Sequence, residues 1–209
     1  MSSTVYIIDD DRLARESLQW LIESAGLPVR VFDSGLDFLE RVEPSMGGCV
    51  LLDVRMPDIN GMEVYARLKQ MGILLPVIIV TGHADVAMAV RAMKAGAYDL
   101  IEKPYNDALM LERVQSAISA DQQRRRDQQR VSDIKARAAQ LTPREQEVLH
   151  YVLRSTQNKI IAAKLGISIK TVELHRANLM SKMQARTSTE LVRLALIAGL
   201  DQPAGEADT

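Results

Sequence analysis

The chain has 209 residues, of which 47% are hydrophobic and 25% charged, and its net charge is −1. This is ordinary for a soluble globular protein, and the length suits two domains. No apolar stretch approaches the ~18 residues of a membrane span, and the N-terminus lacks the basic-then-apolar pattern of a secretory signal. The single cysteine, Cys49, excludes a disulfide framework within the chain. We therefore expect a cytoplasmic protein without a membrane partner, in which Cys49 is a small core residue.

The near-zero net charge conceals an asymmetry along the chain. Residues 1–120 carry 11 Lys/Arg and 17 Asp/Glu, whereas residues 121–200 carry 15 and 7. An acidic half joined to a basic half indicates that the second half meets a polyanion. Alternatively, the charged residues only keep the surfaces of the two halves hydrated, and the charge distribution alone does not exclude this.

The first 119 residues alternate between strand and helix patterns. Strands are predicted at 4–8, 28–32, 49–53, 76–80 and 99–101. Helices are predicted at 11–25, 34–42, 60–71, 84–95 and 106–119. In the first of these helices, Leu13, Trp20 and Leu21 follow helical spacing. Five alternations with short connections predict an α/β fold: a flavodoxin-like, doubly wound sheet of five parallel strands with helices on both faces.

The next segment, residues 121–140, differs in character. Residues 121–130 include no apolar residue, Gly or Pro, and a spacing of three to four returns with Val131, Ile134 and Ala138. We interpret this segment as a partly helical linker with weak self-association. A solvated hinge fits equally well.

Residues 141–200 give only helix patterns. Thr142-Pro143-Arg144-Glu145 has the residues of a helix start, and Gly166 and Gly199 have the character of helix stops. Short helices joined through a glycine-containing turn, within a basic domain, predict an all-α, four-helix helix-turn-helix domain. Residues 201–209 are expected to be a disordered tail.

Polar residues of complementary type follow four of the predicted strands. They are Asp9 and Asp10, Asp53, Thr81, and Lys103. In a parallel sheet, these residues would lie close together at the carboxyl edge. Two carboxylates ~4 Å apart repel by roughly 4 kcal/mol at an effective dielectric of 20. A cation must offset that repulsion, and oxygen-only ligands favour Mg²⁺. Lys103 and Thr81 can then contact a phosphoryl group that one carboxylate accepts as a nucleophile.

These residues resemble the landmarks of the receiver domain of two-component response regulators. The match consists of the Asp-Asp pair after the first strand, Asp53 in Asp-x-Arg-Met-Pro, Thr81, and Lys103-Pro104. The resemblance implies a phospho-receiver domain over 1–120 with Asp53 as the phosphorylation site. It also implies that Mg²⁺ is held by Asp9, Asp10, Asp53 and the backbone carbonyl of Arg55. Thr81 and Lys103 would contact the phosphoryl group.

One position departs from that pattern. Many receivers carry an aromatic residue three before the lysine, and here the position holds Leu100, with Tyr98 and Tyr105 on either side. The rotamer switch that such an aromatic residue performs is therefore altered or replaced, whereas the phosphorylation chemistry does not depend on it.

The helix predicted from Ser168 to Met183 is the candidate recognition helix, with Val172, Leu179 and Met183 on its core face. Its opposite face would meet base edges in the major groove. Candidate DNA contacts are Lys159, Lys170, Arg176 and Lys182 for phosphates, Glu173, Leu174 and Ala177 for bases, and His175 and Asn178 for either. Thr171 is a further candidate DNA contact.

The basic half resembles the LuxR-type DNA-binding domain over 141–200. The motif comprises Leu-Thr-Pro-Arg-Glu-Gln-Glu-Val-Leu from Leu141, Asn158-Lys159-x-Ile-Ala, and Thr171-Val172-Glu-x-His175-Arg. The family's usual glycine before the Asn-Lys pair is absent, and Ser155-Thr156 stand there instead. A helical dimerisation domain with a solvated basic face is the alternative.

The two domains together resemble the FixJ branch of the NarL/FixJ family. That resemblance implies a transcription factor controlled by a sensor histidine kinase. Our hypothesis is that phosphorylation exposes a dimerising face formed by the helix at 84–95 and the fifth strand. Double-stranded promoter DNA and RNA polymerase are the further expected partners. The chain would not be an enzyme, except that it mediates its own aspartyl phosphorylation with Mg²⁺.

Two rival functions remain. A phosphatase or phosphotransferase could use the same site, although Arg55 stands where a second acid would follow Asp53. The other rival is a constitutive DNA-binding protein with a vestigial acidic domain. Leu100, which stands in place of the usual aromatic switch residue, is the feature that supports it.

Overall fold

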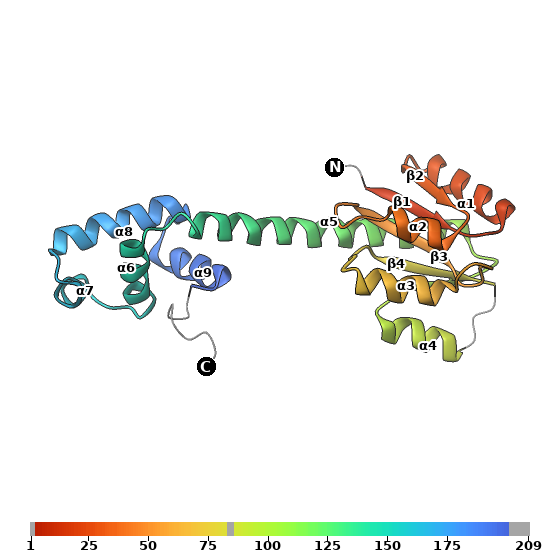
Figure 1. Ribbon diagram of the computed structural model, residues 1–209. Helices are drawn as coiled ribbons and strands as arrows, with labels where there is room; N and C mark the ends of the chain where they lie inside the picture. Colours follow the sequence, from red (N-terminus) through yellow and green to blue (C-terminus); the bar gives the residue numbers. More distant parts are fainter. Residues whose placement is uncertain (1–2, 83–85, 201–209) are drawn as a thin grey trace, which may run out of the picture. The chain divides into compact units, whose positions relative to one another are not determined.

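The computed structural model describes residues 3–82 and 86–200, and the chain forms two compact units, Met1–Arg125 and Arg126–Thr209 (Figure 1). The tail predicted to be disordered, residues 201–209, lies outside the described residues. No helix in the described ranges has the length and apolar composition that crossing a membrane requires. The domain boundaries predicted at 120 and 140 stay a prediction.

The first unit is a five-stranded parallel sheet covered by helices on both faces. The strands are β1 Thr4–Ile8, β2 Val29–Phe32, β3 Gly48–Asp53, β4 Val77–Thr81 and β5 Asp99–Glu102, in the order β2-β1-β3-β4-β5. The helices are α1 Arg12–Ser24, α2 Gly35–Arg41, α3 Gly61–Gln70, α4 Val86–Ala95 and α5 Asp107–Ala138. The predicted α/β fold is confirmed.

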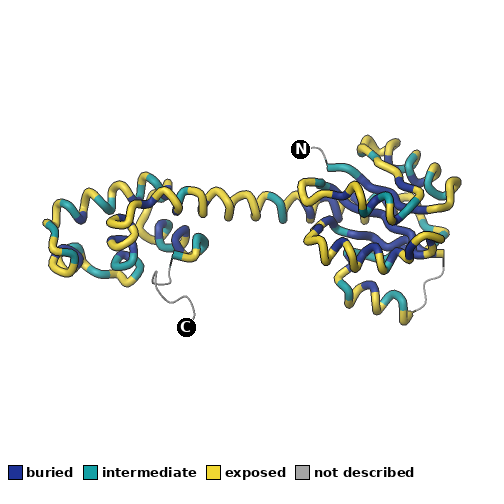
Figure 2. Tube along the Cα trace, in the orientation of Figure 1, coloured by how far each residue is buried: buried dark blue, intermediate teal, exposed yellow. Residues whose placement is uncertain are grey.

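The central strands are buried at every residue because both faces of the sheet are covered (Figure 2). Alternate side chains enter two separate cores. Ile8 and Leu52 pack with residues of α2, α3 and α4, whereas Ile7 belongs with Leu51 to the core that α1 and α5 complete. This alternation leaves the strand ends as the places where polar side chains can emerge at the carboxyl edge.

Helix α1 forms where it was predicted, but its apolar spacing does not mark its buried face. Leu18 and Ile22 are its buried residues, while Leu13 is 77% and Trp20 74% exposed. The sheet selects the face of the helix that lies against it, and exposed apolar residues occur on many protein surfaces.

Helix α5 extends well beyond its predicted end at residue 119 and is continuous to Ala138. Side-chain pairs one helical turn apart, such as Gln129 with Asp133, occur on its surface. Near its end, Ile134 and Ala138 are buried in the core of the second unit. The segment interpreted as a partly helical linker is therefore helical as far as Ala138.

The second unit contains α6 Pro143–Leu153, α7 Asn158–Leu165, α8 Ile169–Met183 and α9 Ser188–Ala198. Thr142 and Glu145 form a complete capping box at the start of α6. Gly166 and Gly199 adopt the left-handed conformation that ends α7 and α9. The predicted all-α helix-turn-helix architecture is confirmed.

Cys49 has no exposed surface, and its pKa is raised to about 12, first by burial and then by the nearby charge of Asp121. We expect the thiol to resist alkylation at pH 8 in the folded protein, because almost none of it is thiolate and reagents do not reach it. Mass spectrometry after alkylation with and without denaturant tests this. Rapid labelling of the native protein would contradict the buried position.

Candidate functional site

Two carboxylates and one ammonium meet at the carboxyl edge of the sheet. Asp9 follows β1, Asp53 ends the neighbouring strand β3, and Lys103 follows β5. The Lys103 Nζ lies 2.6 Å from Asp9 Oδ2 and 2.8 Å from Asp53 Oδ1. The two carboxylate side chains are only 5% and 9% exposed. The sequence prediction that these residues lie together is met for this trio.

The ammonium of Lys103 offsets the repulsion between the two carboxylates. Burial lowers the pKa of Lys103, but its hydrogen bonds to Asp53 and Asp9 outweigh burial and leave the pKa raised. Lys103 is therefore protonated at neutral pH. The other oxygen of Asp53 accepts a hydrogen bond from the backbone N–H of Arg55, at 2.6 Å.

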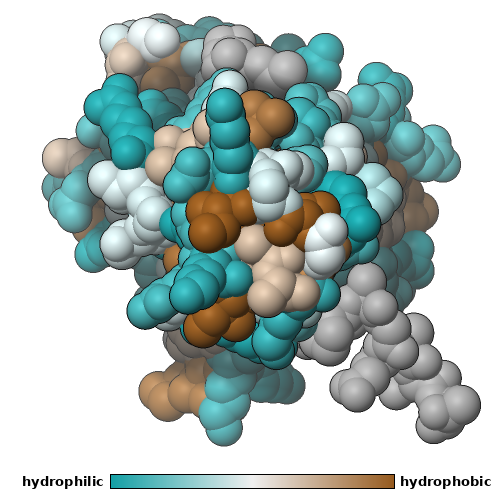
Figure 3. Space-filling model, turned by 90° about the vertical axis from the view of Figure 1, so that its left-hand side faces the viewer, coloured by the Kyte–Doolittle hydropathy of each residue, from teal (hydrophilic) through white to brown (hydrophobic). Residues whose placement is uncertain are grey.

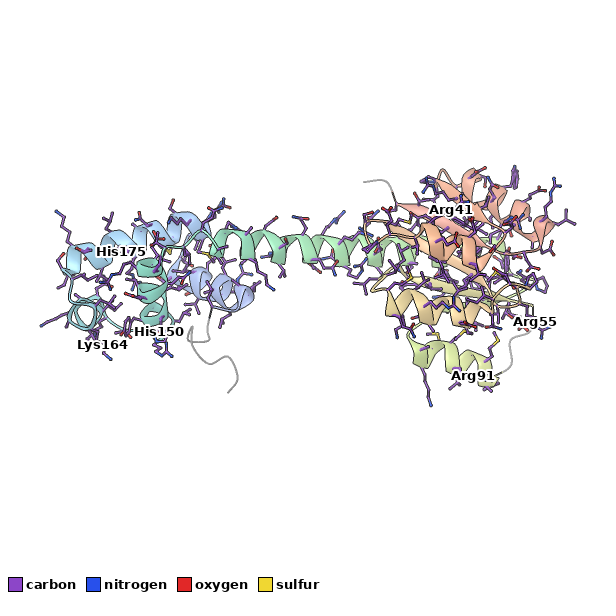
Figure 4. All side chains as sticks on the ribbon, in the orientation of Figure 1. Arg41, Arg55, Arg91, His150, Lys164 and His175 are labelled. Atoms are coloured by element: carbon purple, nitrogen blue, oxygen red, sulfur yellow. The ribbon has the colours of Figure 1, made fainter. Side chains whose placement is uncertain are left out.

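The remaining predicted members of the acidic site lie around this trio. Thr81 ends β4, is 1% exposed, and is paired with Glu102 in the sheet register. Asp10 is exposed in the turn after β1. Arg55 is exposed on the loop after β3 (Figure 4). Asp11, the third acid of the run, caps α1 by accepting hydrogen bonds from the backbone N–H groups of Leu13 and Ala14, as predicted.

As a metal site, the predicted cluster of Asp9, Asp10 and Asp53 stays a prediction, although the structure does not bring all three acids together. Among the described residues, no group of three or more Asp, Glu, His or Cys side chains lies close enough to hold a metal ion. Asp10 is exposed, and Lys103 bridges Asp9 and Asp53 in place of a third carboxylate. The donor chemistry nevertheless fits a hard cation, because carboxylates and a backbone carbonyl supply only oxygen atoms.

Gly61 fixes the loop that leads away from Asp53. Its N–H donates to the carbonyl of Val54 at 3.0 Å, and an added Cβ would lie 2.1 Å from the backbone oxygen of Asp53. We expect Gly61→Ala to lower the free energy of unfolding of the first unit by about 1 to 3 kcal/mol, because backbone must move to admit the methyl group. Urea unfolding measures this. Gly82→Ala is the control, since its Cβ would meet no atom of the described residues within 4 Å; equal losses in both variants would contradict the steric argument.

Leu100 and the neighbouring tyrosines pack against different cores of the first unit. Leu100 packs partly buried against the core that contains Ala92 of α4. Tyr98 and Tyr105 pack against the other core, and the Tyr98 hydroxyl lies 2.6 Å from Ser116 Oγ. Neither tyrosine therefore shares the packing environment of Leu100.

The core and outer faces of α8 lie as predicted for a recognition helix. Val172, Leu179 and Met183 are buried in the core of the second unit. The exposed candidate DNA contacts are Lys159, Lys170, Glu173, Leu174, Ala177 and Asn178. Figure 3 shows apolar side chains among polar ones on one face of this unit. The exposed large apolar residues of α7 and α8 are Ile160, Ile169 and Leu174.

Four candidate DNA contacts are more enclosed. Lys182 pairs with the buried Glu145 at 2.7 Å and donates to the carbonyl of Gln140, so its charge has a partner inside the domain, and its contact with a DNA phosphate stays a prediction. His175 is half-buried on α8 (Figure 4), and its Nδ1 has no hydrogen-bond partner among the described residues. Thr171 and Arg176 are also half-buried; the Thr171 hydroxyl lies 2.8 Å from Ser168 Oγ.

The ion pair of Glu145 predicts a pH dependence. Burial raises the pKa of Glu145, but hydrogen bonds from Lys182 and Thr142 outweigh it and leave the pKa below its ordinary 4.5. Its stabilising effect is therefore complete above pH 4.5 and is lost as the pH falls through the lower, folded value. We expect Glu145→Gln to destabilise the second unit by about 1 kcal/mol at pH 7, a modest figure because Lys182 is partly exposed. Thermal unfolding across pH 7 to ~3 tests this; a difference from wild type that persists at low pH would contradict it.

The motif around Thr142 predicted the start of α6, but no local pattern indicates the partnership of Glu145 with Lys182, 37 positions away. A long-range ion pair has no local pattern. The same is true of the bridging position of Lys103.

Comparison with known proteins matches both units to families. The response regulator receiver domain matches residues 5–115, and the LuxR family of bacterial regulatory proteins matches residues 139–195. Transcriptional regulatory protein FixJ of Bradyrhizobium diazoefficiens is 43% identical over 196 residues, covering 94% of this chain and 96% of that protein. Response regulator protein TodT of Pseudomonas putida is 42% identical over 193 residues, covering 92% and 85%.

Solved structures agree with these matches. The response regulator StyR has a TM-score of 0.87 at 37% identity, covering 94% of this chain and 99% of that one. Full-length FixJ from B. japonicum has a TM-score of 0.57 at 42% identity, covering 96% and 99%. The chain therefore belongs to the NarL/FixJ family of two-component response regulators, in its FixJ branch, and is a transcriptional regulator that joins a receiver domain to a LuxR-type DNA-binding domain.

Proposed function

We propose that Asp53 accepts a phosphoryl group from a phosphohistidine of a sensor histidine kinase. An oxygen of Asp53 bonds to phosphorus while the phosphorus–nitrogen bond breaks, and the electron pair returns to the imidazole. The observation that carries this proposal is the pairing of Asp53 with Asp9 through the single ammonium of Lys103. A carboxylate held in this way is fixed at the sheet edge and stays available as a nucleophile.

The residues around Asp53 suit the charge of the product. Asp9, Asp10, Asp53 and the backbone carbonyl of Arg55 would hold Mg²⁺, which supplies positive charge to the phosphoryl oxygens when bound. Lys103, which donates to Asp53, would donate to the phosphoryl group instead. Thr81 would contact the same group from the end of β4. The chain would thus mediate only its own phosphorylation, without turning over an external phosphoester.

Phosphorylation would favour one of two pre-existing states of the receiver, and that state would form a homodimer. The apolar residues Val86, Val90 and Met93 on α4 are 81%, 45% and 48% exposed. They support a dimer that uses α4 and β5, because solvent-exposed apolar side chains gain by burial against a second copy. Leu100 replaces the usual aromatic switch residue. The conformational change caused by phosphorylation would therefore be transmitted by the loop after β4 and by α4.

Two LuxR-type domains in a dimer would bind two half-sites of promoter DNA in the cytoplasm, where RNA polymerase is the further partner. We assign base contacts to Glu173, Leu174 and Ala177 on the outer face of α8. Lys159, Lys170 and Arg176 would contact phosphates, and Thr171, His175 and Asn178 would make further contacts with the DNA. Linking two such domains raises the effective concentration of the second for its half-site.

Operator footprinting with and without a small phosphodonor tests this function. We expect the phosphodonor to lower the protein concentration that protects the operator. Equal protection in both conditions would indicate a constitutive DNA-binding protein, and steady release of phosphate from an added phosphoester would indicate an enzyme.

A further inference from the structure

A polar hollow lies beside the recognition helix, inside the second unit. Its volume is about 380 Å³. Two valines contribute to its lining, and its polar lining consists of Ser155, Thr156, Arg176, Ser188 and Thr189. The hollow therefore presents four hydroxyl groups and one guanidinium, and none of its lining residues carries a carboxylate. Hydroxyl and guanidinium groups are donors that suit the oxygens of a phosphate.

The guanidinium of Arg176 lacks an anionic partner among the residues that the structure describes. Its hydrogen bonds go to neutral oxygens, Asn158 Oδ1 at 3.2 Å and Ser188 Oγ at 3.5 Å. On the same helix, Lys182 has the carboxylate of Glu145. Half-buried charges are costly unless they are paired, so an anion would complete the surroundings of Arg176.

The two neighbours of Arg176 stand at helix starts. Asn158 is the first residue of α7, whose N-cap Gln157 makes no side-chain capping hydrogen bond, and Ser188 is the first residue of α9. The N-terminus of a helix carries partial positive charge and favours an anion. The guanidinium of Arg176 lies close to two such helix ends, so its positive charge is repelled by their partial positive charge. An anion bound in the hollow would offset this repulsion.

Ser155 occupies this hollow in a conformation that favours glycine. Its φ is 54°, one of two positive values at non-glycine residues in the described part of the chain. A side chain in this conformation costs backbone strain that glycine at this position would avoid. The glycine would remove both the strain and the hydroxyl.

We propose that this hollow binds one phosphate of the DNA backbone, through Arg176 and the hydroxyls of Ser155, Thr156, Ser188 and Thr189. The inference rests on the proposed DNA binding and adds to it a defined phosphate pocket. A phosphate contact positions the domain on the duplex without reading its sequence. Loss of the pocket must therefore weaken operator and random DNA equally.

Duplex binding by the full-length protein over a range of salt concentrations tests the pocket. We expect Arg176→Gln to weaken operator and random duplex by the same factor and to reduce the slope of log K against log salt by about 0.9. Thr189→Val should weaken both duplexes alike with an unchanged slope. Ser155→Gly should also weaken both, while its melting temperature is at least that of the wild type.

Lys164→Gln is the matched control. Lys164 carries the same charge in the same domain, lies over the ring of Tyr151, and lines a different hollow with His150 (Figure 4). Its removal should leave the slope unchanged. An Arg176→Gln variant with the wild-type slope would overturn the proposal, as would hydroxyl variants that bind both duplexes normally.

Titration with inorganic phosphate, followed by amide NMR shifts, separates this inference from DNA binding as a whole. Shifts confined to Ser155, Thr156 and Ser188 would support an anion pocket even if the operator were unknown or unbound. Such shifts combined with normal DNA binding by every pocket variant would show that the ligand is a free anion and that the assignment to DNA is wrong. Absence of shifts at these amides, with variants that bind DNA normally, would reject the pocket while leaving the proposed function intact.

Discussion

Replacing Asp53 with asparagine is expected to abolish phosphoryl incorporation and, with it, the gain in DNA affinity on adding a phosphodonor. For the wild type, we expect that gain to be on the order of 10²-fold, because dimerisation makes the second half-site contact intramolecular. The amide keeps the shape and accepts the Lys103 hydrogen bond, but it is no nucleophile for phosphorus. Operator binding titrations with and without phosphodonor measure the effect.

Asp58→Asn is the matched control for this substitution. Asp58 lies on the loop that follows Asp53, and its carboxylate accepts hydrogen bonds from Ser34 Oγ and the N–H of Leu36. It lies outside the proposed chemistry, so the variant should retain the full phosphodonor response. A normal response in Asp53→Asn would refute the assigned phosphoacceptor.

Replacing Asp121 with alanine is expected to lower the free energy of unfolding of the first unit by about 2 to 3 kcal/mol. Asp121 is 1% exposed and accepts hydrogen bonds from the N–H of Gly48, from Arg125 Nε at 2.8 Å and from Arg124. Removing one partner of a buried ion pair typically costs about 3 to 5 kcal/mol. We expect less because the two arginines are 30% and 29% exposed and can be hydrated.

Urea unfolding followed by circular dichroism, with amide exchange in β3, measures this loss. Asp133→Ala is the control, because Asp133 lies on the exposed surface of the same helix and accepts from Gln129. Its effect should stay within about 0.5 kcal/mol. If both variants were equally stable, the buried ion pair would contribute nothing to the attachment of α5 to the first unit.

The fold and most of the acidic site were predictable because their determinants are local. Apolar runs that end in Asp9, Asp53 and Thr81 are strand patterns, and parallel strands bring their carboxyl ends to one edge. The helix starts at Thr142 and Ser168 were likewise predictable from capping residues next to apolar spacing.

The features that escaped prediction depend on long-range contacts. Asp121 accepts a hydrogen bond from the N–H of Gly48, 73 positions away in the sequence. Its own segment is a run of charged and amide residues, a composition that predicts a solvent-exposed helix or linker. The buried face of α1 is chosen by the sheet, which is why Trp20 is exposed although it fits helical spacing. Lys103 bridges two acids that sequence reasoning placed with a third. Each case requires the relative positions of elements that no local pattern specifies.

We expect Asp53, whose carboxylate is paired with that of Asp9 through Lys103, to form an acyl phosphate. Mass spectrometry of the full-length protein, after incubation with Mg²⁺ and a small phosphodonor, tests it most directly. The account predicts one acid-labile phosphoryl group, located on the peptide that contains Asp53 and absent when Mg²⁺ is chelated. An unmodified protein, or a stable phosphoryl group on another residue, would contradict it.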